Sequence, residues 1–260
     1  MKVIILSAGV GSRLRPYTNK IPKCLVKVAN LSILDHQLKV FKSFGLDEKS
    51  ISIVGGYLFK KLKNYNINLI ENKRFEETNM VFSFFHGLKK IGLDDDIIIS
   101  YGDIIFEEFI LNQLLNCNYP ISIVADKEWE KLWQLRMEDI LSDAETFKYD
   151  LNKNIFEIGK KPKAISEIDA QYIGLIKIKK EYLKRIFAIY KNLYSKKMNN
   201  IKDIDNIYMT DFIEKLIKSK LPVKACLIEG GWLEVDSTKD LEIYNKLHRQ
   251  KKLNKYCNLE

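Results

Sequence analysis

The sequence predicts an α/β fold with a mostly parallel central sheet flanked by helices. Short apolar runs typical of buried strands alternate with segments of helical periodicity up to about residue 125. This order is typical of parallel strands joined by right-handed crossovers. Beyond that residue, apolar and polar side chains alternate, which indicates antiparallel or mixed strands. No repeat or low-complexity linker divides the chain, so we expect one domain over residues 1–250, with halves at 1–125 and 126–250.

In the first half, the expected elements follow from apolar runs and helical spacing. The strands are expected at residues 3–6, 51–54, 68–71, 97–100 and 121–125. One helix carries Leu34, Leu38 and Phe41, with Asn30 or Ser32 as its cap. Two further helices are expected at residues 57–63 and 80–91, and the second of them follows Thr78 and Asn79.

In the second half, strands are expected at residues 147–160, 171–177 and 223–228, and helices at 183–193, 209–217 and 239–249. Thr210 or Asp211 is expected to cap the second of these helices. Residues 251–260 form a lysine-rich tail that we expect to be frayed. Its last two residues, Leu259 and Glu260, could be a tag scar.

The loop after the first strand has the composition of a phosphate-binding site. Gly9, Gly11 and Ser12 leave backbone N–H groups accessible, and such groups can hold a phosphate chain. Arg13 and Lys23 add two cations to the same segment. The loop therefore predicts a nucleoside-triphosphate site.

Three other interpretations of this loop were weighed. A dinucleotide-binding fold requires a third glycine at the position that Leu14 occupies. An ATP-binding P-loop requires a Gly-Lys-Ser/Thr sequence that is missing at the required spacing. An ordinary glycine-rich turn with surface cations stays open as an alternative.

Composition excludes several classes of protein. The 260 residues include 43 basic and 34 acidic side chains, a net charge of +9, but the lysines are spread along the chain. A basic chain can bind nucleic acid, although this spread does not favour it. No apolar run approaches the ~20 residues of a membrane span, and no secretion signal is evident. The four cysteines are scattered, which favours reduced cytoplasmic thiols over a zinc site.

Two aspartates are candidate magnesium ligands. Asp103 follows the most apolar expected strand, and Asp236 follows a glycine pair and a second apolar run. The carboxyl ends of strands are where α/β sheets bind ligands, and Mg²⁺ prefers hard oxygen ligands together with phosphate oxygens. Either residue could instead form a turn or cap a helix, and Asp236 before Ser237 is well placed to do so.

The motif from Gly9 to Leu14, followed by Pro22-Lys23, resembles the signature loop of the sugar-nucleotidyltransferase superfamily. The resemblance implies a Rossmann-like nucleotidyltransferase fold with a mixed β acceptor-binding part. It also implies transfer of a nucleotide from an NTP to a phosphorylated acceptor, with pyrophosphate as the second product. The first half would be the nucleotide-binding half and the second the acceptor-binding half.

The resemblance also assigns site residues. Arg13 and Lys23 would grip the β- and γ-phosphates as catalytic residues, and Asp103 and Asp236 would hold Mg²⁺. Lys160 would contact the α-phosphate or the acceptor phosphate, although it is hard to separate from Lys161, and a solvated basic turn is the alternative. The nucleotide-binding residues would be Leu6, Ala8, Gly9, Gly11, Ser12, Arg13, Lys23, Gly56, Tyr57, Asn79, Ser83 and Tyr101.

Further segments are similar to the phosphocholine-type cytidylyltransferase subfamily. They are residues 78–83, the aromatic run from Trp129 to Arg136, residues 141–146, residues 208–211 and residues 231–236. Members act on phosphocholine, phosphoethanolamine, aminoethylphosphonate or, in capsule phosphoramidate synthesis, phosphorylated glutamine. The acceptor-binding residues implied are Trp129, Trp133, Asp143, Glu145, Lys160 and Trp232. The tryptophans could face a cation or simply pack in the core.

Together these points predict a cytoplasmic, Mg²⁺-dependent cytidylyltransferase for surface polysaccharide modification. Its partners would be CTP and a small amine- or amide-bearing phosphate, with no nucleic acid and no membrane, and it would be a monomer or homodimer. One alternative is a sugar-1-phosphate nucleotidyltransferase that uses CTP, UTP or dTTP. An alternative of another class is a non-catalytic basic nucleic-acid-binding protein.

Overall fold

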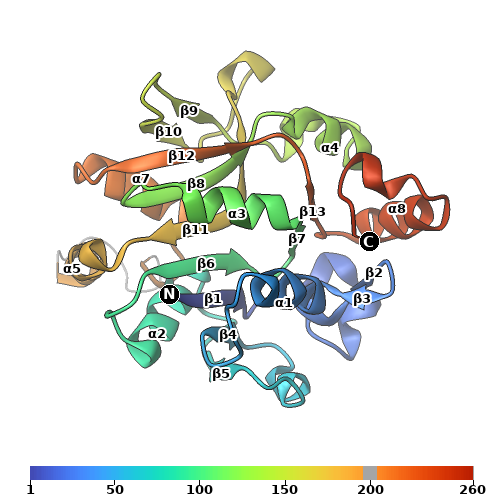
Figure 1. Ribbon diagram of the computed structural model, residues 1–260, viewed down its shortest axis with the longest axis horizontal. Helices are drawn as coiled ribbons and strands as arrows, with labels where there is room; N and C mark the ends of the chain where they lie inside the picture. Colours follow the sequence, from blue (N-terminus) through green and yellow to red (C-terminus); the bar gives the residue numbers. More distant parts are fainter. Residues whose placement is uncertain (196–203, 260) are drawn as a thin grey trace.

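A seven-stranded sheet forms the centre of the computed structural model, which describes residues 1–195 and 204–259. The strands lie in the order β12–β8–β11–β6–β1–β4–β5 (Figure 1). Their bounds are β1 (Lys2–Ser7), β4 (Ile51–Gly55), β5 (Asn68–Glu71), β6 (Ile97–Tyr101), β8 (Ile121–Asp126), β11 (Gln171–Ile178) and β12 (Val223–Ile228). All are mutually parallel except β11, which runs antiparallel to its neighbours β6 and β8. The expected mostly parallel sheet is confirmed.

Helices cover both faces of the sheet. One core cluster contains residues of α1 (Ile33–Ser43), α3 (Glu108–Asn116), α4 (Trp129–Arg136) and α8 (Thr238–Arg249). The other contains residues of α2 (Met80–Ile91), α5 (Lys180–Ser195) and α7 (Met209–Lys218). Figure 1 shows α1 and α3 in front of the strands. Within residues 1–195 and 204–259, no helix is long and apolar enough to cross a membrane.

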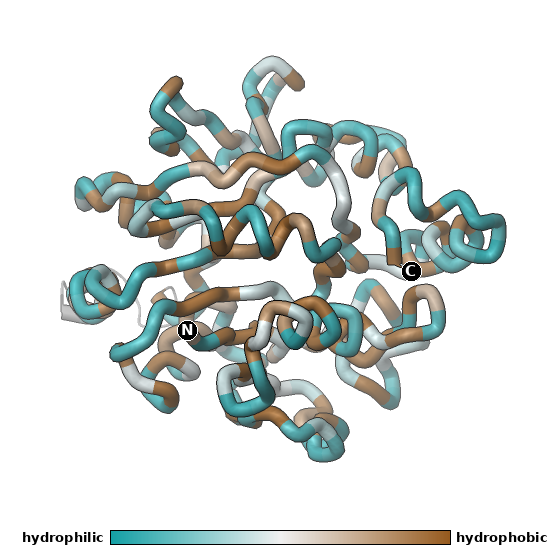
Figure 2. The backbone as a smooth tube through the Cα atoms, viewed as in Figure 1, coloured by the Kyte–Doolittle hydropathy of each residue, from teal (hydrophilic) through white to brown (hydrophobic). Residues whose placement is uncertain are grey.

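The strands are apolar on both sides because they separate these two cores. In β1, Val3 and Ile5 belong to the core under α1 and α3, whereas Ile4 and Leu6 belong to the other. A strand buried on both faces needs a continuous apolar run rather than alternation. Figure 2 shows hydrophobic residues along the central strands and mostly hydrophilic ones on the outer loops.

Three short antiparallel ribbons lie outside the main sheet. They pair β2 (Lys27–Val28) with β3 (Leu31–Ser32), β7 (Ile104–Phe106) with β13 (Trp232–Glu234), and β9 (Phe147–Tyr149) with β10 (Ile155–Ile158). The sequence predicted strands near β9 and β10 but not the β7/β13 ribbon. That ribbon joins segments more than 100 residues apart in the chain, so no local pattern reports it.

Helix caps were predicted with mixed success. Ser32, one of the two predicted caps of α1, accepts a hydrogen bond from the backbone N–H of Asp35 at 3.0 Å, whereas Asn79 caps α2 without having been predicted as a cap. The predicted caps Thr210 and Asp211 are wrong, because Tyr208 occupies the N-cap position of α7 and makes no side-chain cap bond. The helix expected at 57–63 is a short 3₁₀ turn, Phe59–Leu62.

The prediction that the C-terminal tail is frayed is also wrong. After α8 the chain packs back onto the domain, with Leu253 and Cys257 buried. The backbone N–H of Gly231 donates to the carbonyl of Tyr256 at 3.0 Å. The lysine-rich composition of the tail concealed its two apolar anchors. Of the proposed tag scar, Glu260 lies outside the described residues.

Gly174 offers a test of how tightly the sheet packs. It lies in β11 at φ +86°, where a Cβ atom would fall 2.6 Å from the Tyr101 ring. Gly45 has a similar φ of +75° with no atom within 4 Å of such a Cβ, so it is a matched control for backbone strain. We expect Gly174→Ala to lower the free energy of unfolding by about 1–3 kcal/mol more than Gly45→Ala. Denaturant unfolding measures both, and equal losses would contradict the close packing.

Candidate active site

A cavity of about 300 Å³ lies at the carboxyl ends of β1 and β6. This edge of a parallel sheet is the usual ligand site of open α/β folds. Its walls come from four segments: the loop after β1, the start of α2 with the loop before it, the turn after β6, and the segment after β13. The lining residues are Leu6, Ser7, Ala8, Gly9, Gly11, Ser12, Arg13, Lys23, Phe75, Thr78, Asn79, Met80, Ser83, Tyr101, Gly102, Asp103 and Asp236.

The loop after β1 is folded tightly enough to bring its two cations together. Gly11 has φ +63°, and a Cβ atom there would lie 3.1 Å from Cβ of Lys23. The Thr18 hydroxyl donates a hydrogen bond to the Gly11 carbonyl at 2.8 Å. A short 3₁₀ turn, Ser12–Leu14, then carries Arg13. The left-handed backbone of Gly11 together with its close approach to Lys23 favours glycine at this position.

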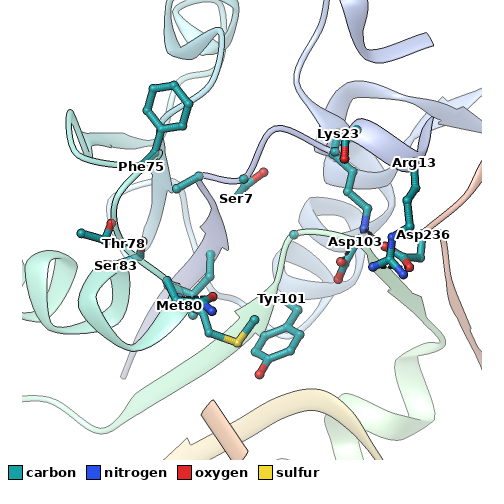
Figure 3. A pocket seen from close by; sticks show the side chains of 17 residues that line it. Ser7, Arg13, Lys23, Phe75, Thr78, Met80, Ser83, Tyr101, Asp103 and Asp236 are labelled. Atoms are coloured by element: carbon teal, nitrogen blue, oxygen red, sulfur yellow. Dashed lines mark hydrogen bonds and ion pairs between the residues drawn. The ribbon is translucent and has the colours of Figure 1, made fainter. Parts of the chain in front are cut away.

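Four charged side chains meet at one end of the cavity, and we call them the ion cluster (Figure 3). Lys23 Nζ lies 2.7 Å from Asp103 Oδ2 and 2.8 Å from Asp236 Oδ1. Arg13 Nη2 lies 2.6 Å from Asp236 Oδ2. The Lys23, Asp103 and Asp236 side chains are 14, 24 and 15% exposed, so solvent screens their interaction only partly.

Electrostatics keep the ion cluster charged. Burial would lower the pKa of the Lys23 ammonium, but Asp103 and Asp236 together raise it above its ordinary value. Burial would raise the pKa of the Asp236 carboxyl, but Lys23 and Arg13 hold it below its ordinary value. Opposite charges at hydrogen-bond distance outweigh desolvation here.

The β7/β13 ribbon explains why two distant aspartates meet. Glu234 pairs with Ile104, and the backbone N–H of Val235 donates to the carbonyl of Asp103 at 2.9 Å. Asp236 follows directly. Gly102 lets the turn pass close to β1, because a Cβ atom there would lie 2.7 Å from the Leu6 carbonyl oxygen.

The cap interpretation of Asp236 is wrong. Ser237 caps α8, in a capping box with Asp240. The backbone N–H of Asp236 donates to Asp240 Oδ2 at 3.0 Å, which leaves the Asp236 carboxylate directed at Lys23 and Arg13. The sequence contained this box, Ser237 followed three residues later by Asp240, and it was overlooked.

A buried arginine fixes β13 beside the ion cluster. Arg136 of α4 lies 2.6 Å from Glu234 Oε2 and 3.1 Å from Asp240 Oδ1, and its side chain is 1% exposed. Burial raises the pKa of Glu234 to about 7, against the opposing effect of Arg136. The network ties α4 and α8 to the strand that precedes Asp236.

The other end of the cavity is built by the loop before α2. Asn72 is buried and donates to Thr78 Oγ1 at 2.9 Å and to Ser83 Oγ at 3.1 Å. Arg74 of the same loop pairs with the buried Asp205 at 2.7 Å. Figure 3 shows Phe75, Thr78 and Ser83 on the side opposite the ion cluster. The cavity thus has one charged end and one end that is mostly neutral.

Most of the expected nucleotide-binding residues line this cavity. They are Leu6, Ala8, Gly9, Gly11, Ser12, Arg13, Lys23, Asn79, Ser83 and Tyr101. Gly56 and Tyr57 do not line it. Gly56 lies behind the wall, where a Cβ atom would fall 2.4 Å from Cβ of Phe75. Phe75 takes the place expected for them.

Sequence reasoning missed five lining residues: Ser7, Phe75, Thr78, Met80 and Gly102. Thr78, Met80 and Gly102 adjoin residues that it did identify, so adjacency could have found them. Ser7 ends β1 between the predicted residues Leu6 and Ala8, so adjacency could have found it as well. Phe75 stands in a polar loop and gives no local signal.

None of the expected acceptor-binding residues lines the cavity. The tryptophans are core residues, so of the two interpretations that the sequence left open the structure supports packing; the cation over the Trp133 ring is Arg136 of the protein itself, at 5.1 Å. Trp129, Trp133 and Trp232 are 1, 3 and 2% exposed, and Trp133 packs against both of the others. The Trp232 indole N–H donates to Asp126 Oδ2 at 2.9 Å. They hold α4 against β13.

The polar acceptor candidates lie elsewhere around the site. Lys160 is exposed, and its ammonium pairs with Glu157, so its contact with a phosphate stays a prediction. Lys161 donates to the carbonyls of Leu141 and Ser142. Asp143 is exposed, whereas Glu145 is half-buried. Burial, with Asp143 and Asp211 nearby, raises the pKa of Glu145.

Comparison with known proteins places this architecture in a family. The MobA-like NTP transferase domain matches residues 3–144. The chain is 43% identical to CTP:phosphoglutamine cytidylyltransferase of Campylobacter jejuni, over 94% of this chain and 98% of that protein. It is 27% identical to choline-phosphate cytidylyltransferase of Streptococcus pneumoniae, over 85% of this chain and 100% of that protein.

Two solved structures share the fold. CTP:phosphocholine cytidylyltransferase from S. pneumoniae superposes with a TM-score of 0.71 at 21% identity, over 96% of this chain and 99% of that one. The inositol-1-phosphate CTP transferase from T. maritima superposes with a TM-score of 0.69 at 21% identity, over 99% of this chain and 97% of that one. These likenesses concern the fold alone.

The ion cluster predicts a pH-dependent loss of stability when Lys23 is removed. Lys23→Met leaves two partly buried carboxylates facing each other, and we expect it to lower the free energy of unfolding at pH 7 by about 2 kcal/mol. Without Lys23 the Asp236 carboxyl loses a cation that holds its pKa down, so burial and the neighbouring carboxylate raise its folded-state pKa above the unfolded value. Stability gained by protonation is then present at low pH and lost as pH rises, so the deficit should shrink between pH 7 and about 4.

Denaturant unfolding at several pH values measures this deficit. The exposed Lys27 is the matched control, because Lys27→Met removes a lysine from the same segment without unpairing a carboxylate. A deficit for Lys23→Met that is independent of pH, or equal to that of the control, would contradict the electrostatic origin.

Proposed function

Since the chain belongs to the MobA-like NTP transferase family, we propose that it transfers CMP from CTP to a small amine- or amide-bearing phosphate and releases pyrophosphate. The choice of CTP rests on the two cytidylyltransferases that the chain resembles over most of its length. The identity is greater with the phosphoglutamine enzyme, 43% against 27%. We therefore favour phosphoglutamine over phosphocholine as the acceptor.

The ion cluster at the glycine-lined loop is the observation that carries this proposal. A triphosphate needs cations and backbone donors in one place, and the loop provides both around Arg13 and Lys23. The mostly neutral end of the cavity, with Phe75 and Thr78, suits a base. Ten of the lining residues were expected from the family resemblance to contact the nucleotide.

The residues of the ion cluster also fit Mg²⁺. Asp103 Oδ1 is buried and has no hydrogen-bond partner among the described residues, so a carboxylate oxygen is available for a ligand. Asp103 and Asp236 supply hard oxygens of the kind that Mg²⁺ prefers, with water and phosphate completing the coordination. No group of three or more His, Cys, Asp and Glu side chains suited to a metal occurs in residues 1–195 and 204–259. When bound here, Mg²⁺ would neutralise charge on the triphosphate.

Catalysis would then rest on positioning and charge. The acceptor phosphate oxygen is already anionic at neutral pH, so it can attack the α-phosphorus of CTP without a general base. The α–β bridging oxygen would leave with the pyrophosphate. Lys23 and Arg13 would turn from the carboxylates to the leaving phosphates, where their charge matters most in the transition state.

Glu145 is our candidate for binding the amine or amide of the acceptor. Burial is the main cause of the raised pKa of Tyr172, and the negative charges of Glu145 and Asp103 add to it. The Tyr172 ring in turn packs edge-on against Tyr101, which lines the cavity. The backbone N–H of Glu145 donates to Oε1 of Gln171, the residue before Tyr172, at 3.4 Å, so Glu145 lies near the cavity without being part of its wall. An anionic carboxylate in a half-buried position would attract a cationic group strongly.

The two alternatives from the sequence receive less support. A sugar-1-phosphate nucleotidyltransferase would share this fold, but the two relatives named above are cytidylyltransferases that act on other phosphates. The ion cluster does not favour a nucleic-acid-binding protein, because two of its four charges are negative and would repel a phosphate backbone.

We expect the purified protein to release pyrophosphate with CTP and phosphoglutamine, and less with UTP, ATP or GTP. Chelation of divalent metal should abolish turnover, and excess Mg²⁺ should restore it. Asp103→Asn should lower kcat/KM by about 100-fold or more, with Asp139→Asn, an exposed turn residue, as the control. ³¹P NMR identifies the product. Turnover with a hexose-1-phosphate instead, or no turnover of any nucleotide, would overturn the proposal.

Glu145→Gln tests the acceptor site separately. The variant should raise KM for the acceptor by about tenfold, the cost of one charge-assisted hydrogen bond, while KM for CTP stays within twofold. Glu138, which is exposed and does not line the cavity, gives the control variant Glu138→Gln. If both KM values rise together, Glu145 acts on the fold of the site rather than on the acceptor.

A further inference from the structure

Two thiols lie in contact on the face of the sheet covered by α1 and α3. Cys117 follows the last residue of α3, and Cys226 lies in β12. Their sulfur atoms are 2.8 Å apart, and both are free thiols. Cys117 is partly exposed, whereas Cys226 is buried. One thiol is thus open to reagents, with a second thiol behind it.

A buried lysine places positive charge beside the pair. Lys177 of β11 is 4% exposed. Its Nζ donates to the carbonyl of Leu115 at 2.9 Å and to that of Cys117 at 2.6 Å. The hydrogen bond between the two thiols lowers the pKa of Cys117, burial opposes this effect, and the charge of Lys177 adds to it. The hydrogen bond and the lysine charge favour the thiolate, which is the nucleophilic form of cysteine.

The pair is accessible from solvent. A groove of about 640 Å³ is lined by both cysteines and also by Gln113, Tyr119 and Lys153. None of the groove's lining residues lines the active-site cavity. A small neutral molecule can therefore reach Cys117 without entering the catalytic site.

We propose that Cys117 and Cys226 form a modification site at which hydrogen peroxide produces an intramolecular disulfide. The Cys117 thiolate attacks one peroxide oxygen, the O–O bond breaks, and hydroxide leaves, which gives a sulfenic acid at Cys117. The Cys226 thiol then attacks that sulfur and displaces the hydroxyl group as water. Overall, two thiols and one peroxide give one disulfide and two waters, so the cysteines are oxidised and the peroxide is reduced.

The local structure permits the bond. A disulfide requires the sulfurs to approach to about 2.05 Å, which is a movement of less than 1 Å from their present 2.8 Å. Cys117 is the C-cap residue of α3 and has extended dihedral angles, φ −65° and ψ 106°. Its backbone N–H still donates to the carbonyl of Gln113 at 3.0 Å, but its ψ is not helical, so the small sulfur movement can come from its side chain without unwinding α3.

The bond would also constrain a large part of the chain. It would close a loop that contains α4, β11, α5 and α7. Closing a long loop lowers the entropy of the unfolded chain, and we expect Tm to rise by roughly 5–15 °C. The proposal does not depend on the transfer reaction, because its readouts are mass, thiol count and Tm.

The test treats the full-length, reduced protein with one equivalent of hydrogen peroxide. Intact mass should fall by about 2 Da, and the four free thiols should decrease to two. Peptide mapping should find the Cys117–Cys226 cross-link, and Tm should rise. Cys257→Ala, which removes a buried thiol elsewhere, should retain the cross-link.

Variants of the pair separate the two steps. Cys226→Ser should leave a sulfenic acid at Cys117 that a 1,3-dione reagent traps, and Cys117→Ser should react with peroxide at least tenfold more slowly. If either variant fails to fold, the wild-type mass still decides. An unchanged thiol count, a cross-link between two copies, or a gain of oxygen at one cysteine without the 2 Da loss would overturn the proposal.

Discussion

Attraction between two cations and two carboxylates is the constraint on which the rest of this structure depends. Lys23 stands between Asp103 and Asp236, and Arg13 completes the charge balance. Two carboxylates this close would repel each other without a cation between them. The surrounding architecture therefore has to deliver four side chains from distant parts of the chain to one place.

Several elements that contribute no residue to the ion cluster position its four side chains. The β7/β13 ribbon aligns Asp103 with Val235. The tryptophan cluster and Arg136 then fix that ribbon against α4 and α8. The tryptophans, which the sequence left as either ligand contacts or core residues, are thus supports for the site. Their motif was informative about the family and misleading about their role.

Much of the fold could be predicted from the sequence because the central strands are buried on both faces. Such strands are continuous apolar runs, and every strand of the main sheet was located within a few residues. The short elements α3 and α4 were missed. α4 is only 8 residues long and mixes charged side chains with tryptophans that pack, so its periodicity is weak.

The site was predictable where chemistry concentrates in a motif. Arg13, Lys23, Asp103 and Asp236 were all named from the sequence, because they lie beside glycines or after apolar runs, and the structure brings the four together. Phe75 could not be found, since its place in the wall depends on its packing against Gly56. The acceptor side was predicted least well, because burial of a tryptophan cannot be read from its neighbours in sequence.

The position of β11 determines whether the chain can be divided. β11 comes late in the sequence, yet it lies between β6 and β8 and bonds to both. A fragment ending near residue 125 would retain β6 and most of β8 without the strand that joins them, and the remaining fragment would lack both partners of β11. Each piece would expose open backbone edges of the kind that promote aggregation. The two halves are therefore interleaved, and neither half could be replaced by that of another protein without replacing the other.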